Sequence, residues 1–170
     1  PALLQNSTRF LSEQDSLNAS ILGPDATAGT PEFDQFIKEA TAEITTKAGQ
    51  KCTAIRRIFV PQDQIDAVTE ALSARLASIT IGDPNNKDIR MGALASHGQK
   101  ADVLDKLSRI QADAQIVFGD PDNFDLTDAD AAGAFLPPML LRCDDPDAAM
   151  AVHDCEAFGP LSTVMPYRDV

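Results

Sequence analysis

A predicted helix passes into a predicted strand through the stretch Lys47-Ala48-Gly49-Gln50-Lys51-Cys52-Thr53-Ala54-Ile55-Arg56-Arg57, which continues into Ile58-Phe59-Val60-Pro61. Gly49 permits a sharp turn of the backbone shortly before Cys52. Loops held between rigid elements are where reactive side chains often sit. The stretch therefore predicts a helix–loop–strand junction that presents a cysteine.

The cysteine of this junction lies among basic residues in a chain that is otherwise acidic. Its basic neighbours are Lys47, Lys51, Arg56 and Arg57. Nearby cations favour the thiolate, which is the reactive form of cysteine. A single cysteine beside basic residues is nevertheless more often an inert thiol next to a solvated charge cluster. The local sequence therefore leaves both a reactive and an inert Cys52 open.

The composition indicates one globular domain with an aliphatic core. The chain has 170 residues, of which 44% are hydrophobic and 5% aromatic, and it has no Trp. Its formal net charge is −12, from 14 Lys plus Arg against 26 Asp plus Glu. Such a surface repels phosphate backbones and anionic lipids, so we expect no nucleic-acid or membrane partner. Neither a membrane-spanning run nor a signal-peptide pattern is present in the sequence.

Three cysteines, Cys52, Cys143 and Cys155, cannot all pair within one chain. Their spacing fits no zinc pattern, so we predict no metal site and a reduced, cytoplasmic setting. Cys143 and Cys155 are expected to be buried or partly buried free thiols. In His153-Asp154-Cys155, adjacent side chains point in different directions, which argues against a metal site or a Cys–His pair there.

Strand and helix patterns alternate along the chain. Strands are predicted at residues 16–22, 54–60, 115–118, 139–143 and 161–166, and helices at 31–47, 63–78, 96–112 and 146–152. Thr30 can cap the first of these helices, with Pro31 at its first position. This order predicts an α/β fold with a mainly parallel sheet flanked by helices. The sequence contains no GxGxxG motif and no P-loop, and its abrupt ends suggest a fragment.

Three segments resemble motifs of the aldehyde dehydrogenase family. Gly49-Gln50-Lys51-Cys52-Thr53 resembles its catalytic-cysteine motif, and Glu156-Ala157-Phe158-Gly159-Pro160 resembles its acidic-x-Phe-Gly-Pro turn. Between them, Phe135-Leu136-Pro137-Pro138-Met139-Leu140-Leu141 resembles the aromatic-x-x-Pro-x-Leu-Leu strand. The motifs follow the family's order, and the resemblance covers about residues 10–165. It implies the family's catalytic-domain fold for residues 17–170, a tail at 1–16 that carries the catalytic Glu, and a cofactor-binding domain outside this chain.

The resemblance also implies a role for each site residue. Cys52 would be the nucleophile, and Glu13 would activate the water that hydrolyses the resulting thioester. Glu156 would hydrogen-bond the ribose next to the nicotinamide, and Phe158 would pack near the nicotinamide ring. The backbone N–H of Cys52 would help to hold the oxyanion, together with a side-chain amide from outside the chain.

Two details qualify these roles. The family usually surrounds its general base with Glu-Leu-Gly-Gly-Lys, whereas this chain has Ser12-Glu13-Gln14-Asp15-Ser16, which makes Asp15 a rival to Glu13. Gln50 and Thr53 are expected to shape the loop rather than to take part in the chemistry. Because the cofactor-binding half would lie elsewhere, we expect these 170 residues alone to be inactive.

Residues 13–18, 23–25 and 47–57 resemble a subgroup of the family that oxidises CoA-linked semialdehydes during the breakdown of aromatic acids. The first interpretation is the phenylacetate branch, and the alternative is the 3,4-dehydroadipyl-CoA semialdehyde of the benzoyl-CoA branch. The subgroup implies NADP as the cofactor, with NAD as the alternative, and a homo-oligomer in the full-length protein. Two other hypotheses stay open, a thiol acyltransferase that acts on CoA esters and a non-catalytic scaffold.

Overall fold

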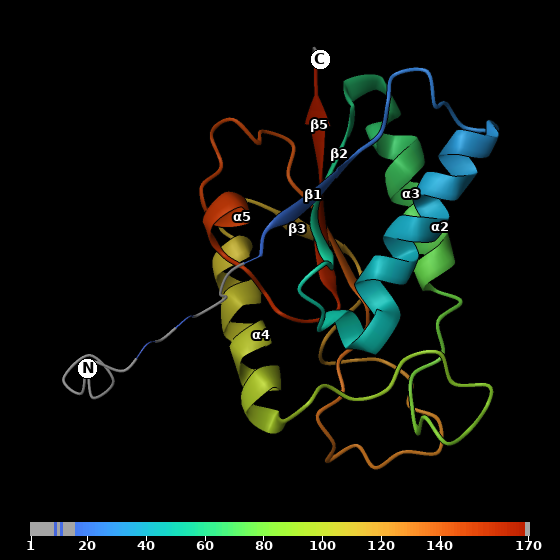
Figure 1. The fold of residues 1–170 in the computed structure, drawn as a ribbon, viewed down its shortest axis with the longest axis vertical. Coiled ribbons are helices and arrows are strands. Elements are labelled where there is room, and N and C mark those ends of the chain that lie inside the picture. Colours follow the sequence, from blue (N-terminus) through green and yellow to red (C-terminus); the bar gives the residue numbers. More distant parts are fainter. Residues whose placement is uncertain (1–8, 10, 12–15, 169–170) are drawn as a thin grey trace.

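The computed structural model describes residues 9, 11 and 16–168, so Glu13 and Asp15 lie outside the described residues. The elements follow in the order β1 (Asn18–Ile21), α2 (Pro31–Thr45), the 3₁₀ helix η1 (Thr46–Gly49), β2 (Ile55–Pro61), the 3₁₀ helix η2 (Gln62–Gln64), α3 (Ile65–Leu76), α4 (His97–Ile110), β3 (Gln115–Phe118), β4 (Met139–Arg142), α5 (Ala151–Asp154) and β5 (Leu161–Tyr167) (Figure 1). This alternation is the one that the sequence predicts.

The strands form one five-stranded sheet in the order β1-β2-β5-β4-β3. The β1–β2, β2–β5 and β5–β4 pairs are parallel, and only β3 runs antiparallel, against β4. Strand β5 therefore lies at the centre, with Thr163 opposite both Arg57 of β2 and Leu141 of β4. The predicted α/β class with a mainly parallel sheet is confirmed.

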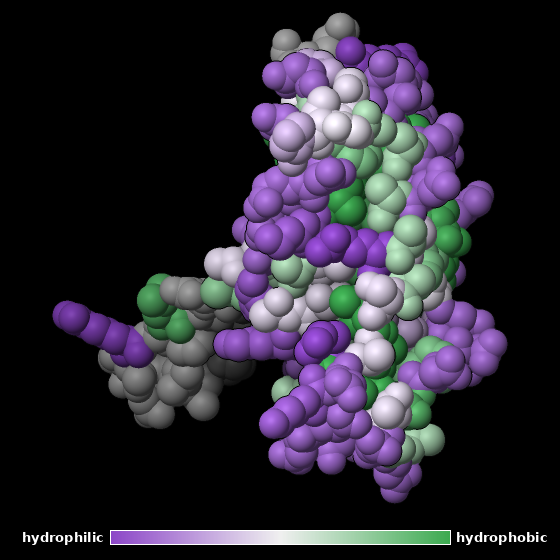
Figure 2. Space-filling view, turned by 90° about the vertical axis from the view of Figure 1, so that its right-hand side faces the viewer, coloured by the Kyte–Doolittle hydropathy of each residue, from purple (hydrophilic) through white to green (hydrophobic). Residues whose placement is uncertain are grey.

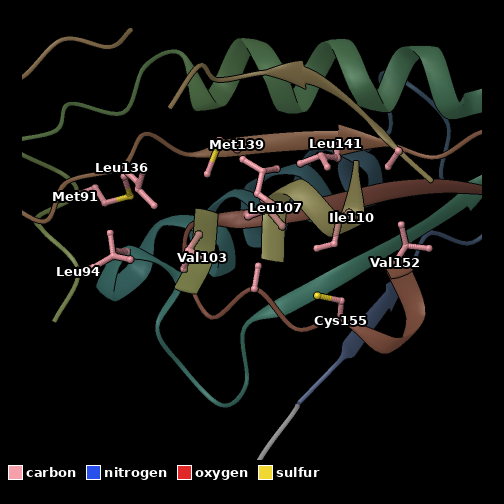
Figure 3. Packing of buried hydrophobic residues seen from close by; sticks show 14 of the residues in the cluster. Met91, Leu94, Val103, Leu107, Ile110, Leu136, Met139, Leu141, Val152 and Cys155 are labelled. Carbon is pink, nitrogen blue, oxygen red and sulfur yellow. The ribbon is translucent and has the colours of Figure 1, made fainter. Parts of the chain in front are cut away.

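Helices cover both faces of the sheet, with α2 and α3 on one side and α4 and α5 on the other (Figure 1). Successive strand residues alternate between the faces. Leu140 and Val164 accordingly pack with the buried face of α2 and α3. Leu141 and Met165 belong instead to the cluster that contains Leu107 of α4. Figure 3 shows this second cluster, in which Met139 and Leu141 point toward the α4 side.

Of the four predicted helices, those expected to begin near residues 31 and 96 have their starts confirmed by side-chain caps at Thr30 and Ser96. Phe33 N donates to Thr30 Oγ1 at 3.3 Å, and Gln99 N donates to Ser96 Oγ at 3.2 Å. Helix α2, however, ends at Thr45 rather than at residue 47. Lys47 and Ala48 have φ values of 54° and 52°, which belong to the left-handed region. These two residues end the helix and turn the chain toward the cysteine.

The helix predicted at residues 146–152 is wrong, because the structure has only the short α5 at Ala151–Asp154. The carboxylate of Asp113 accepts from Met150 N at 2.8 Å and from Ala151 N at 2.5 Å. These bonds satisfy free backbone donors where α5 begins. The start of α5 is thus set by a residue 37 positions away, which a local sequence pattern cannot reveal.

Figure 2 shows the face of the molecule on the α2 and α3 side, where hydrophilic side chains surround a strip of more hydrophobic ones. The Phe33 side chain of α2 is buried, whereas Glu32 and Asp34 beside it are exposed. None of the described helices combines the length and the apolar character that crossing a membrane requires.

Candidate active site

Cys52 lies in the short loop between η1 and β2, and its side chain is exposed. Backbone hydrogen bonds keep the loop compact, from Gln50 N to Lys47 O at 3.0 Å and from Ala54 N to Lys51 O at 3.1 Å. Cys143 and Cys155 are both buried, and none of the three cysteines forms a disulfide. Cys52 is thus the cysteine that a solvent-borne substrate can reach.

Asn18 holds this loop from the neighbouring strand. Its side-chain Nδ2 donates to Cys52 O at 2.7 Å and to Ala54 O at 3.1 Å. The start of β1 therefore runs beside the loop, five residues after the predicted general base Glu13. The sequence analysis missed Asn18, and a single polar residue at the start of a strand gives no signal of such a bond.

The cysteine loop, which comprises residues 47–54, packs directly against the Phe158–Gly159 turn. Gly49 has a φ of 68°, and a side-chain carbon at this position would lie 2.1 Å from Gly159 O. Gly159 is confined in turn, because a side-chain carbon there would lie 2.7 Å from Val103 Cγ2 of α4. The structure thus brings together two motifs about a hundred residues apart in the sequence.

Gln50 joins the loop to α4 and to the same turn. Its Oε1 accepts from Ala95 N at 2.8 Å. Its Nε2 donates to Gln99 Oε1 and to Phe158 O, both at 3.2 Å. All the polar atoms of the Gln50 amide are therefore used to fix the backbone near Cys52, which is the loop-shaping role expected of it.

Arg56 is a buried cation, with 4% of its surface exposed. Its two terminal nitrogens donate to Gly159 O and Gly49 O, both at 2.7 Å. Its Nε lies 3.5 Å from Glu156 Oε1, and its guanidinium carbon lies 5.4 Å from the centre of the Phe158 ring. Burial lowers the pKa of Arg56, and the neighbouring charge of Glu156 opposes this shift.

The two-residue period of the strand indicates that Arg56 is buried, although the basic cluster alone does not. In a strand, residues two apart share a face. Arg56 therefore shares a face with Ile58 and Val60, which are both fully buried. Reading the predicted strand with this period would have placed Arg56 inside the protein and Arg57 on the opposite face.

Two other cations near Cys52, Lys51 and Arg57, also have polar partners. Lys51 Nζ lies 2.7 Å from Glu43 Oε1 of α2. Arg57 donates to Leu17 O, and its terminal nitrogen lies 3.5 Å from His153 Nδ1. Since Lys51 and Arg56 each face a carboxylate, part of their charge is balanced locally. Stabilisation of a Cys52 thiolate by these cations stays a prediction.

Glu156 and Phe158 lie on the turn that touches the cysteine loop. Glu156 is buried, and its Oε2 accepts from Ser16 N at 2.8 Å. Its Oε1 has no hydrogen-bond partner among the described residues. The Phe158 side chain is partly exposed. Glu156 Oε1 faces Arg56 Nε and is buried in this structure. A carboxylate beside an accessible aromatic ring fits the ribose and nicotinamide end of a dinucleotide in chemical type, since ribose hydroxyls donate hydrogen bonds.

A cavity of about 590 Å³ adjoins the first half of the cysteine loop. Its lining is mostly apolar and comprises Lys47, Ala48, Gln50, Pro84, Gly92, Ala93, Ala95 and Phe135. A second cavity, of about 410 Å³, lies where β2 and β5 end, and its lining includes Phe59, His153 and Tyr167. Within residues 9, 11 and 16–168, no three His, Cys, Asp or Glu side chains converge as a metal site would require.

The sequence is similar to known proteins over part or nearly all of its length. It is 46% identical over 170 residues to the 3,4-dehydroadipyl-CoA semialdehyde dehydrogenase of Aromatoleum evansii, an alignment that covers 99% of this chain and 33% of the relative. It is 46% identical over 80 residues to Protein MaoC of Klebsiella aerogenes, covering 46% of this chain and 22% of that protein. The chain thus spans about a third or less of the length of these relatives.

The fold is similar to parts of solved aldehyde dehydrogenase structures. The betaine aldehyde dehydrogenase of Staphylococcus aureus in complex with NAD+ superposes with a TM-score of 0.79 at 28% identity, over 98% of this chain and 31% of that one. The gamma-glutamyl-gamma-aminobutyraldehyde dehydrogenase of Burkholderia cenocepacia superposes with a TM-score of 0.76 at 26% identity, over 91% of this chain and 29% of that one. These likenesses confirm the predicted catalytic-domain fold.

A family profile also matches almost the whole chain. The profile of the aldehyde dehydrogenase family matches residues 2–170. The match includes the cysteine loop, the Phe158–Gly159 turn and every described strand. The chain belongs to the aldehyde dehydrogenase family.

Proposed function

We propose that the full-length protein oxidises a CoA-linked semialdehyde to the carboxylic acid, with Cys52 as the nucleophile and a nicotinamide dinucleotide as the oxidant. One observation carries this proposal. The exposed Cys52 lies on a loop that packs against the Phe158–Gly159 turn, which directly follows Glu156. The activity is proposed for the full-length protein, because the chain spans a third of its first relative.

In the first stage, the Cys52 thiolate adds to the aldehyde carbon. A carbon–sulfur bond forms, and the carbonyl π electrons move onto oxygen. We propose that the backbone N–H of Cys52 helps to hold this negative charge. An oxidised nicotinamide, when bound, supplies the acceptor for the hydride that leaves this carbon. The product on Cys52 is a thioester.

In the second stage, water hydrolyses the thioester. We propose that Glu13 takes a proton from this water while the oxygen attacks the acyl carbon. The carbon–sulfur bond then breaks, which releases the carboxylic acid and restores the thiolate. Asp15 is the rival base, and both carboxylates lie in the segment that leads to Ser16 and Asn18, which are fixed to the site.

Glu156 and Phe158 are proposed to bind the nicotinamide end of the cofactor. The support is the carboxylate of Glu156, whose Oε1 accepts no hydrogen bond from the described residues, and the partly exposed ring of Phe158 on the same turn. We propose NADP on the subgroup resemblance and keep NAD as the alternative, since the S. aureus relative was solved with NAD+. A cytoplasmic homo-oligomer is the corresponding proposal for the full-length protein.

The substrate proposal is supported by the name of the A. evansii relative, which acts on a CoA-linked semialdehyde. That name favours the 3,4-dehydroadipyl-CoA semialdehyde, which was the alternative in the sequence analysis. The phenylacetate branch stays a prediction. Assays of the two CoA semialdehydes side by side, with each free semialdehyde as a reference, would decide between the branches.

The direct test is Cys52→Ala in the full-length protein, followed by the formation of reduced nicotinamide. Removing the nucleophile should lower the turnover number at least about 1,000-fold. Cys155→Ala serves as the control and should keep the activity of the folded enzyme. Activity that survives Cys52→Ala contradicts the proposal. Acyl transfer from CoA without reduced nicotinamide would indicate the acyltransferase instead.

A further inference from the structure

Arg56 links the two halves of the candidate site through a single side chain. One terminal nitrogen bonds to Gly49 O, three residues before Cys52, and the other bonds to Gly159 O, three residues after Glu156. The glycines at this contact have no side chains to hold the two segments. The Gln50 amide also joins them, through Phe158 O, but the guanidinium bonds to a backbone oxygen on each segment.

The link is made by a charge that is kept inside the protein. Arg56 Nε and Glu156 Oε1 are buried, lie 3.5 Å apart, and have no hydrogen-bond partner among the described residues. An incompletely bonded buried pair is a weak source of stability, since desolvation offsets much of the attraction. A hydrophobic side chain would avoid this desolvation cost, but it would leave Gly49 O and Gly159 O without the bonds that join the two segments. The cation therefore points to a function in the site.

We propose that Arg56 is a positioning residue, which aligns the Glu156–Phe158 turn with the Cys52 loop so that the hydride donor and acceptor meet in one fixed geometry. This inference rests on the proposed function. Glu156 Oε1 lies 3.5 Å from Arg56 Nε, and Glu156 Oε2 accepts a hydrogen bond from Ser16 N. The Arg56 guanidinium also lies over the Phe158 ring. Arg56 thus fixes both residues proposed to contact the cofactor.

Lysine cannot replace arginine in this arrangement. An ammonium is a point charge, whereas the guanidinium presents its donors in a rigid planar fork. Arg56 uses this fork to reach two carbonyl oxygens on different segments. The cysteine loop, in contrast, keeps its own anchors in Asn18 and Gln50 when Arg56 is changed. The alignment of the turn should therefore suffer more than the nucleophile.

The experiment compares two reactions of the full-length enzyme carrying Arg56→Lys. Aldehyde oxidation needs both the loop and the turn. Hydrolysis of p-nitrophenyl acetate needs Cys52 and the base that hydrolyses its thioester, but no cofactor. Arg56→Lys should lower kcat/KM for aldehyde oxidation on the order of 100-fold, the effect of about 1 Å of misplacement. Ester hydrolysis should fall by less than about threefold, and the KM for the cofactor should rise.

The ratio of the two rates does not depend on how much of the variant folds, because both rates come from the same sample. Arg56→Gln is the second variant and should lower the ratio at least as much. Arg142→Gln is the matched control, since Arg142 pairs with Asp66 and Asp144 at the surface and should leave the ratio unchanged. An unchanged ratio in both Arg56 variants overturns the proposal.

Cys52→Ala separates this inference from the proposed function. If it abolishes both reactions while the Arg56 variants keep the ratio of the two rates, only the positioning role is wrong. If either reaction survives Cys52→Ala, the proposed function fails and the role of Arg56 fails with it.

Discussion

The α-carbon of Gly49 faces the carbonyl oxygen of Gly159 so closely that a side-chain carbon at position 49 would lie 2.1 Å from that oxygen. This contact joins the cysteine loop to the Phe158–Gly159 turn through backbone alone. The two segments can approach in this way only while position 49 carries no side chain. The spacing between nucleophile and turn is therefore set by the absence of a methyl group.

Gly49→Ala should destabilise the protein by at least about 2 kcal/mol, through backbone strain and a clash with backbone atoms. Gly29→Ala is the matched control, because Gly29 also has a positive φ, of 93°, but nothing lies within 4 Å of its added carbon. We expect only about 1 kcal/mol there. Urea unfolding of both variants measures the difference, and equal losses would contradict the contact.

Asn18→Ala removes both bonds from the strand to the cysteine loop and should cost about 1–2 kcal/mol of folding stability. Asn18→Asp keeps the shape but faces two carbonyl oxygens with an acceptor, so it should cost at least as much. Hydrogen exchange of the backbone amides at residues 51–54 should rise in both variants. Unchanged exchange in this loop would show that Asn18 does not hold it.

Gln50→Glu tests the amide that joins the loop to α4. The carboxylate keeps the acceptor for Ala95 N but loses the donor to Phe158 O, so it places negative charge against that carbonyl oxygen. We expect a loss of about 1–3 kcal/mol in the free energy of unfolding. Gln99→Glu leaves the bonds to Ala95 and Phe158 intact and should cost less. Thermal unfolding of the two variants provides the comparison.

Iodoacetamide at pH 8 should label Cys52 in the native protein and spare Cys143 and Cys155. Burial raises the pKa of both inner thiols, which lowers their thiolate fraction, and it also blocks the reagent. Mass spectrometry of the peptides reads the three sites separately. All three should react in urea. Labelling of Cys143 before Cys52 in the folded protein would contradict the structure.

The same two thiols predict a loss of stability in alkali. Their pKa values in the folded protein lie above the unfolded value of about 9. Between these values the unfolded chain releases protons that the folded chain keeps, so the stabilisation present below pH 9 is lost as the pH rises. The urea concentration at the midpoint of unfolding should therefore decrease as the pH rises above about 9. Cys143→Ala should weaken this dependence.

The sequence predicted those parts of the fold that depend on neighbouring residues. Thr30 and Ser96 mark helix starts because a hydroxyl next to free backbone donors acts locally. The start of α5 was wrong because Asp113, far away in the sequence, supplies the cap. The reversed direction of β3 and the place of β5 at the centre of the sheet depend on the packing of the whole chain.

The candidate site divides in the same way. Cys52, Glu156 and Phe158 came from motifs, and the structure brings their two segments together. Asn18 was missed because its partners are backbone oxygens across the sheet. The sequence indicates Arg56 as a cation beside the thiol, whereas in the structure its guanidinium bonds to Gly49 O and Gly159 O. Strand period would have placed Arg56 inside the protein, but not its partners.

The central position of β5 has a consequence for how the protein is made. Strands β1 and β2 on one side and β4 and β3 on the other join within the sheet only through β5, the last of these strands in the chain. During synthesis the two halves therefore emerge with unpaired edges, which are prone to aggregate. The sheet can close only after β5, which ends at Tyr167, has left the ribosome, so chaperones that shield nascent chains should matter most before that point.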